Sequence, residues 1–201
     1  MSFPTRTKST TSIRQPLVVG EQTTSFLQLI REIGETLFIA GILFLAVNLV
    51  TARIKVEGSS MEPSLHDGEF VVINRLAYRW AEPDRGEIIV FRYPLDPERR
   101  FIKRIIGLPG DEISVHQGVV LVNGIPLDEP YISAPPLYDG EWTVEQGRYF
   151  VLGDNRNNSS DSQNWGSLAS DNIIGKAVVV YWPINDLGII PHYELVSASE
   201  N

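Results

Sequence analysis

Hydrophobic residues in this chain form one long run near the amino terminus and many short runs after it. Residues 36–52, TLFIAGILFLAVNLVTA, contain no charged side chain. At a rise of 1.5 Å per residue, a helix over this run would be about 25 Å long, close to the hydrocarbon thickness of a bilayer. Apolar residues also recur at helical spacing just upstream, where Ser25 and Gln28 match a capping box. We therefore predict one helix over residues 25–52, preceded by a disordered Ser/Thr-rich tail over residues 1–24.

The apolar run is open to three interpretations: a transmembrane anchor, a cleavable signal sequence and a buried helix of a soluble domain. Its end, Val50-Thr51-Ala52, resembles a small-residue cleavage site. We favour the anchor because the preceding segment of about 35 residues is longer than a typical n-region. Basic residues are more numerous before the run than just after it, which favours a cytoplasmic amino terminus. They are Arg6, Lys8, Arg14 and Arg31 before the run, and Arg53 and Lys55 after it.

After Arg53 the pattern changes to short segments of β-branched and aromatic residues separated by Gly and Pro, which are typical of strands. Asn123-Gly124 is a strong hairpin signal because both residues tolerate positive φ. No comparable helical period follows, so we predict a mainly β, antiparallel domain over residues 53–201 with a small inserted β subdomain at about 110–146. The predicted strands are residues 70–73, 88–91, 101–106, 119–122, 149–152 and 174–182.

Composition narrows the range of functions. The formal net charge of −8 is unlike the basic surface of a nucleic-acid-binding protein, and 43% hydrophobic residues is ordinary for a globular protein. A chain with no cysteine has no disulfides, no thiolate catalysis and no Cys-based zinc site. The sequence has no metal or nucleotide motif, so we expect no cofactor, no metal and no nucleic-acid partner.

The candidate nucleophile is Ser60. It lies in the segment GSSMEPSL, residues 58–65, between the apolar run and the first predicted strand. Small neighbours and a Met-x-Pro turn would leave its hydroxyl exposed. A free serine hydroxyl is a weak nucleophile, so the chain must also supply a base that removes its proton.

The identity of that base stays open from the residues alone. Lys103 lies in the apolar segment FIKRII, where strand alternation puts Phe101 and Ile105 on its own face. Poor solvation lowers the pKa of a lysine from about 10.4 and favours the neutral amine. Lys176 lies in a similar apolar strand and is the second candidate. A Ser-His-Asp triad is the weaker alternative, because the histidines are scattered over a turn, a strand edge and a tail. These are His66, His116 and His192.

Three segments together resemble the successive boxes of type I signal peptidases, which are membrane-anchored Ser/Lys proteases that remove signal peptides. They are GSSMEPSL (58–65), RFIKRIIGLPGD (100–111) and GDNRNNSSDS (153–162), and they occur in the family's order after an apolar anchor. The resemblance covers residues 36–182. It implies the antiparallel β fold that signal peptidases share with SOS repressors.

The resemblance also implies a role for each residue of the dyad and its surroundings. Ser60 matches the nucleophile and Lys103 the general base, which sets Lys176 aside. Ser159 matches a serine that hydrogen-bonds the lysine amine and orients it. Asp161 matches an aspartate close to the dyad.

Two further residues of the third segment, Asp154 and Arg156, match an acidic and a basic residue that have a structural role in the family. One position departs from the family, which often has arginine two residues after Asp161, where this chain has Gln163. A salt bridge from Asp161 to that position cannot form, so Arg156 or Arg104 would have to compensate.

Substrate binding follows from the same resemblance. The Ser60 backbone N–H would hold the oxyanion, because Gly58 stands where some members have a hydroxyl-bearing residue. Met61 and Pro63 would border a shallow apolar pocket that accepts small side chains. The implied partners are signal peptides of exported preproteins and the lipid bilayer. The implied location is a single-pass protein of the plasma membrane, or of a thylakoid-type membrane, with its catalytic domain outside the cytoplasm.

Two other functions fit parts of the sequence. Self-cleaving SOS repressor domains also use a Ser/Lys pair on a β scaffold, but they lack an anchor and carry an amino-terminal DNA-binding helix pair. The apolar run at residues 36–52 therefore disfavours a repressor. The other alternative is a membrane-tethered β module that binds partners without catalysis, which preprotein cleavage would exclude.

Overall fold

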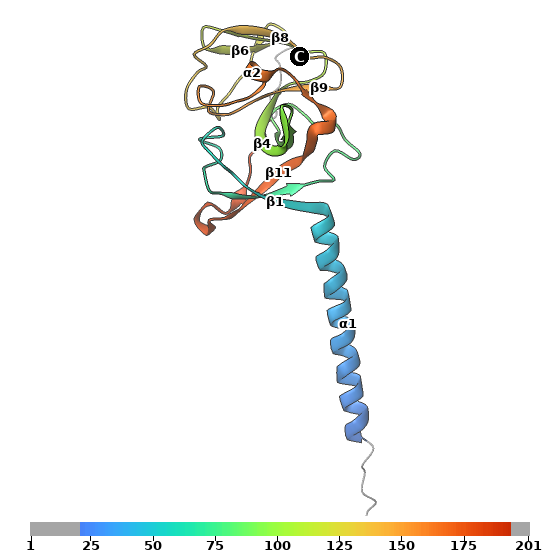
Figure 1. Cartoon of the computed structure of the whole chain (residues 1–201). Helices are drawn as coiled ribbons and strands as arrows, with labels where there is room; N and C mark the ends of the chain where they lie inside the picture. The colour runs from blue at the N-terminus through green and yellow to red at the C-terminus, as the bar shows by residue number, and fades with distance from the viewer. Residues whose placement is uncertain (1–20, 194–201) are drawn as a thin grey trace, which may run out of the picture. The chain divides into compact units, whose positions relative to one another are not determined.

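A single long helix, α1 (Glu21–Val50), precedes all the strands (Figure 1). The computed structural model describes residues 21–193, with side chains from residue 26 onward. The predicted tail lies outside the described residues except for residues 21–24, which belong to α1. The helix therefore begins before the expected capping box. It ends at Val50 because Thr51 already pairs in a sheet.

The described part of α1 has the properties of a membrane span. Phe26–Val50 has a mean hydropathy of 2.1, and its most apolar stretch is not buried. The exposure of these side chains argues against a buried helix of a soluble domain. The cleavage site expected of a signal sequence lies inside strand β1 (Thr51–Lys55), where a cut after Ala52 would remove two residues from a sheet. Both observations favour the anchor.

An eight-stranded antiparallel sheet forms most of the region after α1. Its strand order is β1-β2-β11-β3-β4-β9-β10, and β12 pairs with β11. Strands β4 and β9 are neighbours in this order although they are far apart in sequence, which brings Lys103 close to the loop after β9. The strands are β1 (Thr51–Lys55), β2 (Phe70–Asn74), β3 (Ile88–Tyr93), β4 (Asp96–Gly107), β9 (Arg148–Leu152), β10 (Leu168–Ala169), β11 (Ile173–Trp182) and β12 (Gly188–Ile189).

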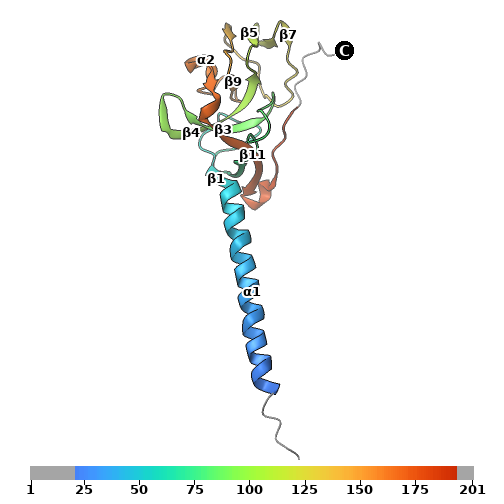
Figure 2. The ribbon, with the colours of Figure 1, turned by 90° about the vertical axis from the view of Figure 1, so that its right-hand side faces the viewer.

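A second, four-stranded antiparallel sheet of order β7-β6-β5-β8 lies within the segment predicted as an inserted subdomain. Its β6–β7 turn has Asn123 at φ +52° and Gly124 at φ +78°, as the hairpin signal predicts. Figures 1 and 2 both show this sheet at the opposite end of the β region from β1. Its strands are β5 (Glu112–His116), β6 (Val119–Val122), β7 (Ile125–Pro126) and β8 (Gly140–Thr143).

The centre of the eight-stranded sheet is buried on both faces. In β3, Ile88 and Val90 pack in one hydrophobic cluster, while Ile89 and Phe91 pack in another. A third cluster lies between β9 and the four-stranded sheet and includes Phe150. In β4, the neighbour of β3, the second half from Ile102 onward is buried in the same way. Three short helices complete the described fold: α2 (Ser162–Trp165), η1 (Ser170–Asn172) and η2 (Ile184–Asp186).

The mainly antiparallel β fold with one amino-terminal apolar helix is confirmed, and each predicted strand lies within an observed one. The strands that the pattern missed are short or polar. β1 has the sequence TARIK and β8 has the sequence GEWT. In β1 only Ala52 and Ile54 are apolar and the strand directly follows the long apolar run, while β8 has one large apolar residue, so cross-strand pairing rather than local preference identifies both.

Candidate active site

Ser60 lies in a tight turn between β1 and β2. Gly58 has φ +81°, a conformation that favours glycine, and its N–H donates to Asp67 Oδ1 at 2.7 Å. The Glu62 N–H donates to the Ser59 carbonyl at 3.1 Å. The small residues of this segment are thus needed for the turn that presents the hydroxyl.

The loop after β9 holds this turn in position. The Asn155 N–H donates to the Ser60 carbonyl and the Asn155 side chain donates to the Ser59 carbonyl, both at 3.1 Å. Asn158 Nδ2 donates to Ser59 Oγ at 2.9 Å. A Cβ atom on Gly153 would lie 2.4 Å from the Ser60 carbonyl oxygen, so only glycine allows the loop to approach so closely. Sequence reasoning identified this loop but assigned no role to the two asparagines.

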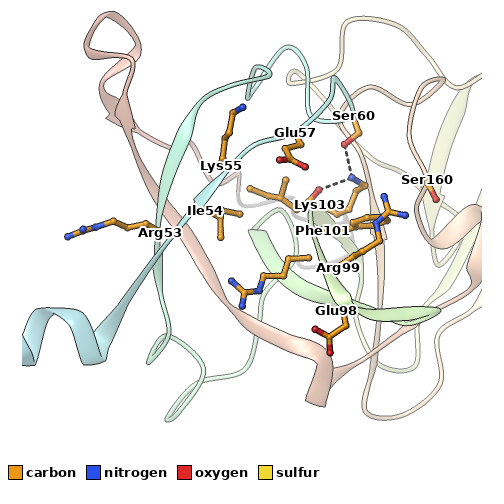
Figure 3. A pocket seen from close by; sticks show the side chains of 12 residues that line it. Arg53, Ile54, Lys55, Glu57, Ser60, Glu98, Arg99, Phe101, Lys103 and Ser160 are labelled. Carbon is orange, nitrogen blue, oxygen red and sulfur yellow. Dashed lines mark hydrogen bonds between the residues drawn. The ribbon is translucent and has the colours of Figure 1, made fainter.

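Lys103 reaches the nucleophile from β4. Its Nζ lies 2.7 Å from Ser60 Oγ and donates to the Ile102 carbonyl at 2.8 Å, as the dashed lines in Figure 3 show. The Phe101 ring lies beside it, with its centroid 5.5 Å from Nζ. Lys103 is 3% exposed, which agrees with the prediction that apolar neighbours surround it.

Burial changes the acidity of this amine. Desolvation disfavours the charged form and lowers the pKa of Lys103 to about 8, while the nearby carboxylates of Asp161 and Asp154 act in the opposite direction. The net effect is a lysine that is neutral in a substantial fraction of molecules near pH 8.

Ser159 and Asp161 lie next to the dyad. Among the described residues the Ser159 hydroxyl makes no hydrogen bond of normal geometry, although it is close enough to the Asp161 carboxylate to lower its pKa. The acceptors found for Lys103 Nζ are on Ser60 and Ile102, so the contact from Ser159 to the amine stays a prediction. Asp161 accepts from the Gly153 N–H at 2.9 Å and caps α2, and burial raises its pKa.

The two arginines expected to compensate for Gln163 have other partners. Arg104 forms a two-pronged salt bridge with Asp154 at 2.9 and 2.7 Å, and both side chains are fully buried. Arg156 forms one with Glu129, a residue that no sequence pattern singled out. The expected compensation is therefore wrong. Backbone N–H groups and the α2 cap hold Asp161 instead.

A cavity of about 600 Å³ opens beside Ser60 and Lys103, between β1 and the first half of β4. Met61 and Pro63 do not line it, contrary to the prediction. Met61 is fully buried and belongs to the same hydrophobic cluster as Leu65, and Pro63 is exposed outside the cavity. The lining residues are Arg53, Ile54, Lys55, Glu57, Ser60, Glu98, Arg99, Arg100, Phe101, Ile102, Lys103 and Ser160.

The alternative bases lie in other contacts. Lys176 is ion-paired with Glu87. His66 and His116 are more than half exposed and lie beside glutamates. His192 accepts a hydrogen bond from the Ile88 N–H through Nδ1. Among the described hydrogen bonds, none joins these side chains to Ser60.

Comparison with known proteins agrees with this geometry. Residues 29–182 match the family model described as signal peptidase, peptidase S26. Probable signal peptidase I-2 of Synechocystis sp. is 45% identical over 79% of this chain and 76% of its own length. Signal peptidase I of Leptolyngbya laminosa is 41% identical over 77% and 80%. Probable thylakoidal processing peptidase 2 of Arabidopsis thaliana is 38% identical over 71% of this chain and 41% of its own length.

The family match spans most of the chain and includes the turn of Ser60, the strand of Lys103 and the loop after β9. It excludes the repressor and the non-catalytic module as descriptions of the whole protein. This chain belongs to the signal peptidase family, peptidase S26.

Proposed function

We propose that Ser60 and Lys103 form the catalytic dyad of this protein, with Ser60 as the nucleophile and Lys103 as the general base. The chain is a membrane-bound serine endopeptidase that cleaves signal peptides. The observation that carries the dyad assignment is the 2.7 Å contact between Lys103 Nζ and Ser60 Oγ in a site where the amine is 3% exposed.

The proton path follows from the contacts of the amine. A neutral amine has two N–H groups and one lone pair, and the N–H donated to the Ile102 carbonyl fixes its orientation. The lone pair then accepts the Ser60 proton while Oγ attacks the scissile carbonyl carbon. Lys103, now charged, protonates the leaving amine as the peptide C–N bond breaks. Water then hydrolyses the acyl-serine ester, with Lys103 again as the base.

The oxyanion would bind at the Ser60 backbone N–H. The Asn155 side chain donates to the Ser59 carbonyl, which belongs to the same peptide unit as the Ser60 N–H and so orients it, and Gly58 adds no side-chain donor. A backbone donor of this kind contributes about 3 kcal/mol to transition-state stabilisation.

An extended substrate fits between two free strand edges. In the described sheets β1 pairs only with β2, and β4 pairs with β9 only from Arg104 onward. Residues 51–55 and 96–103 therefore each present one unpaired edge, and both border the cavity. Backbone pairing to such edges binds a peptide in extended form and gives a defined register at Ser60.

We further infer that the amino terminus is cytoplasmic and that the catalytic domain is on the other side of the membrane. The basic residues before the apolar run support this orientation. A plasma membrane or a thylakoid-type membrane fits, and the similarity to the thylakoidal processing peptidase supports the second. Protease digestion of sealed vesicles tests the orientation: residues 143–201 should be cut only when the extracytoplasmic side faces the added protease.

The dyad is tested with the purified full-length chain and a preprotein substrate. Ser60→Ala and Lys103→Arg should each reduce kcat/KM by roughly 10⁴-fold, because alanine has no nucleophile and an arginine side chain does not release its proton. Lys103→Met, which is close in volume, should do the same.

The matched control is Lys176→Arg, which keeps the charge beside Glu87 and should retain cleavage. Near-ultraviolet circular dichroism of each variant separates loss of catalysis from loss of folding. Cleavage at the original rate by any of the Ser60 or Lys103 variants would contradict the dyad assignment.

A further inference from the structure

The cavity beside the dyad has a positively charged rim. Four exposed basic residues line it, and we call them the cationic rim; the same lining contains two acidic residues, Glu57 and Glu98. The whole chain has a formal net charge of −8, so this local excess of positive charge runs against the composition. The cationic rim consists of Arg53, Lys55, Arg99 and Arg100.

Arg99 is the member of the rim whose position is best fixed. Its guanidinium lies 5.2 Å from the centroid of the Phe101 ring and 5.9 Å from that of Tyr93. The two rings stack on each other at 4.4 Å, and Figure 3 shows Arg99 beside Phe101 and Lys103. Stacking of this kind reduces the conformational freedom that an arginine loses when it binds a partner.

Strand geometry relates Arg99 to the scissile bond. The Arg99 guanidinium and Lys103 Nζ both lie over the Phe101 ring, which places residues 99, 101 and 103 on one face of β4. Four residues of strand separate Arg99 from Lys103, which corresponds to about 13 Å. A substrate strand has the same rise, so its fourth residue from the scissile bond lies level with Arg99.

We propose that the cationic rim, through Arg99, selects substrates that carry an acidic side chain about four residues from the scissile bond. A guanidinium binds a carboxylate through two parallel N–H···O contacts, which suits recognition of Asp or Glu. This inference rests on the proposed dyad and on an extended substrate beside β4. It adds a preference at a position remote from the small residues next to the cut.

The exposure of the Arg99 side chain limits the size of the preference for an acidic residue. Arg99 is exposed, and ion pairs at exposed sites are weak and screened by salt. Replacing alanine by aspartate at the selected position should raise kcat/KM roughly two- to five-fold. Lysine at the same position should lower it by a similar factor, and high ionic strength should reduce both effects.

The test uses the full-length chain in neutral detergent and quenched fluorescent peptides with alanine next to the cut. Aspartate and lysine are scanned singly over five positions on each side of the scissile bond. One position about four residues away should show the order Asp, Ala, Lys in falling kcat/KM. Arg99→Ala should abolish this order and Arg99→Glu should reverse it, each judged from the ratio of kcat/KM for the aspartate and lysine peptides within one variant.

Arg79→Glu is the matched control, because Arg79 is also an exposed arginine over an aromatic ring, that of Trp80, but does not line the cavity. A flat scan, or equal effects of the two charge reversals, would overturn the proposal. If the scan is flat and Arg99→Glu also binds phosphatidylglycerol vesicles more weakly than the unsubstituted chain, the cationic rim binds lipid headgroups instead. If the unsubstituted chain cleaves no peptide, the protease function itself fails, and this inference fails with it.

Discussion

Burial, more than any neighbouring charge, sets the chemistry of Lys103. Two carboxylates lie near enough to stabilise its charged form, and desolvation still prevails and lowers its pKa to about 8. The contact with the Ile102 carbonyl then directs the lone pair of the neutral amine toward Ser60. An amine that is both uncharged and oriented is what a serine nucleophile requires of a base.

The pH dependence of cleavage should report this pKa. Below it the amine is protonated and inactive as a base, so kcat/KM should rise about tenfold per pH unit and level off above about pH 8. Asp161→Asn removes a charge that raises the pKa of Lys103, so the rising limb should move to lower pH. A limb near the pKa of a free lysine, or one that Asp161→Asn moves to higher pH, would contradict this account.

The same burial makes the catalytic lysine a cost to stability. Lowering its pKa from 10.5 to about 8 corresponds to about 3 kcal/mol at pH 7, where the buried amine is charged. Lys103→Met should therefore increase the free energy of unfolding by up to about 3 kcal/mol at pH 7. The unfolded chain binds more protons than the folded chain between pH 8 and 10.5, so the difference should shrink as pH rises through that window. Urea titration of both proteins in detergent at pH 7 and pH 10 measures this difference in the free energy of unfolding. The same difference at both pH values would contradict a destabilising buried charge on Lys103.

At the scale of elements, β4 connects every part of the site. Its first half carries Arg99 and borders the cavity, Lys103 follows, and Arg104 forms the buried pair with Asp154 of the loop after β9. The Arg104 guanidinium also lies 4.1 Å from the Tyr131 ring centroid. The strand and the loop that hold opposite sides of the Ser60 turn are thus tied together by one ion pair.

Breaking the Arg104–Asp154 ion pair should destabilise the fold. Asp154→Asn leaves the Arg104 charge buried without its carboxylate, and should lower the free energy of unfolding by about 3 to 5 kcal/mol. Asp96→Asn, an exposed acid on the same strand, is the control and should change it by less than about 0.5 kcal/mol. Equal effects of the two substitutions would mean that the pair contributes nothing beyond an ordinary surface charge.

Sequence patterns predicted those elements whose own residues determine them. The uncharged run gave the long helix, and β-branched segments with a Gly-containing turn gave the central strands and the β6–β7 hairpin. The motifs around Ser60 and Lys103 identified two side chains that the structure brings within 2.7 Å. The contacts of Asn155 and Glu129 depend on partners distant in sequence, so no local pattern could reveal them. Met61 was misassigned because adjacency to the nucleophile says nothing about which way its side chain points.

At the scale of the whole molecule, we expect α1, the one membrane-length apolar helix of the described residues, to anchor the protein in a membrane. Leu43 lies in its apolar stretch and is exposed. Leu43→Asp puts a charge in the bilayer at a cost of about 3 kcal/mol and should move much of the protein from the membrane pellet to the supernatant in carbonate extraction. Leu43→Ala should stay in the pellet. If the aspartate variant pellets fully, α1 is not the principal anchor.

The open edges of β1 and β4 have a consequence for the protein in concentrated solution. Most sheet proteins hide such edges, because an unpaired row of peptide groups is a template on which another copy can add and start a fibre. On the proposed mode of substrate binding, these edges stay accessible to an extended peptide, while Pro97, which has no N–H, and the exposed charges of β4 disfavour addition of another copy. The open edges that would bind an extended substrate are thus also the places where a second copy could add.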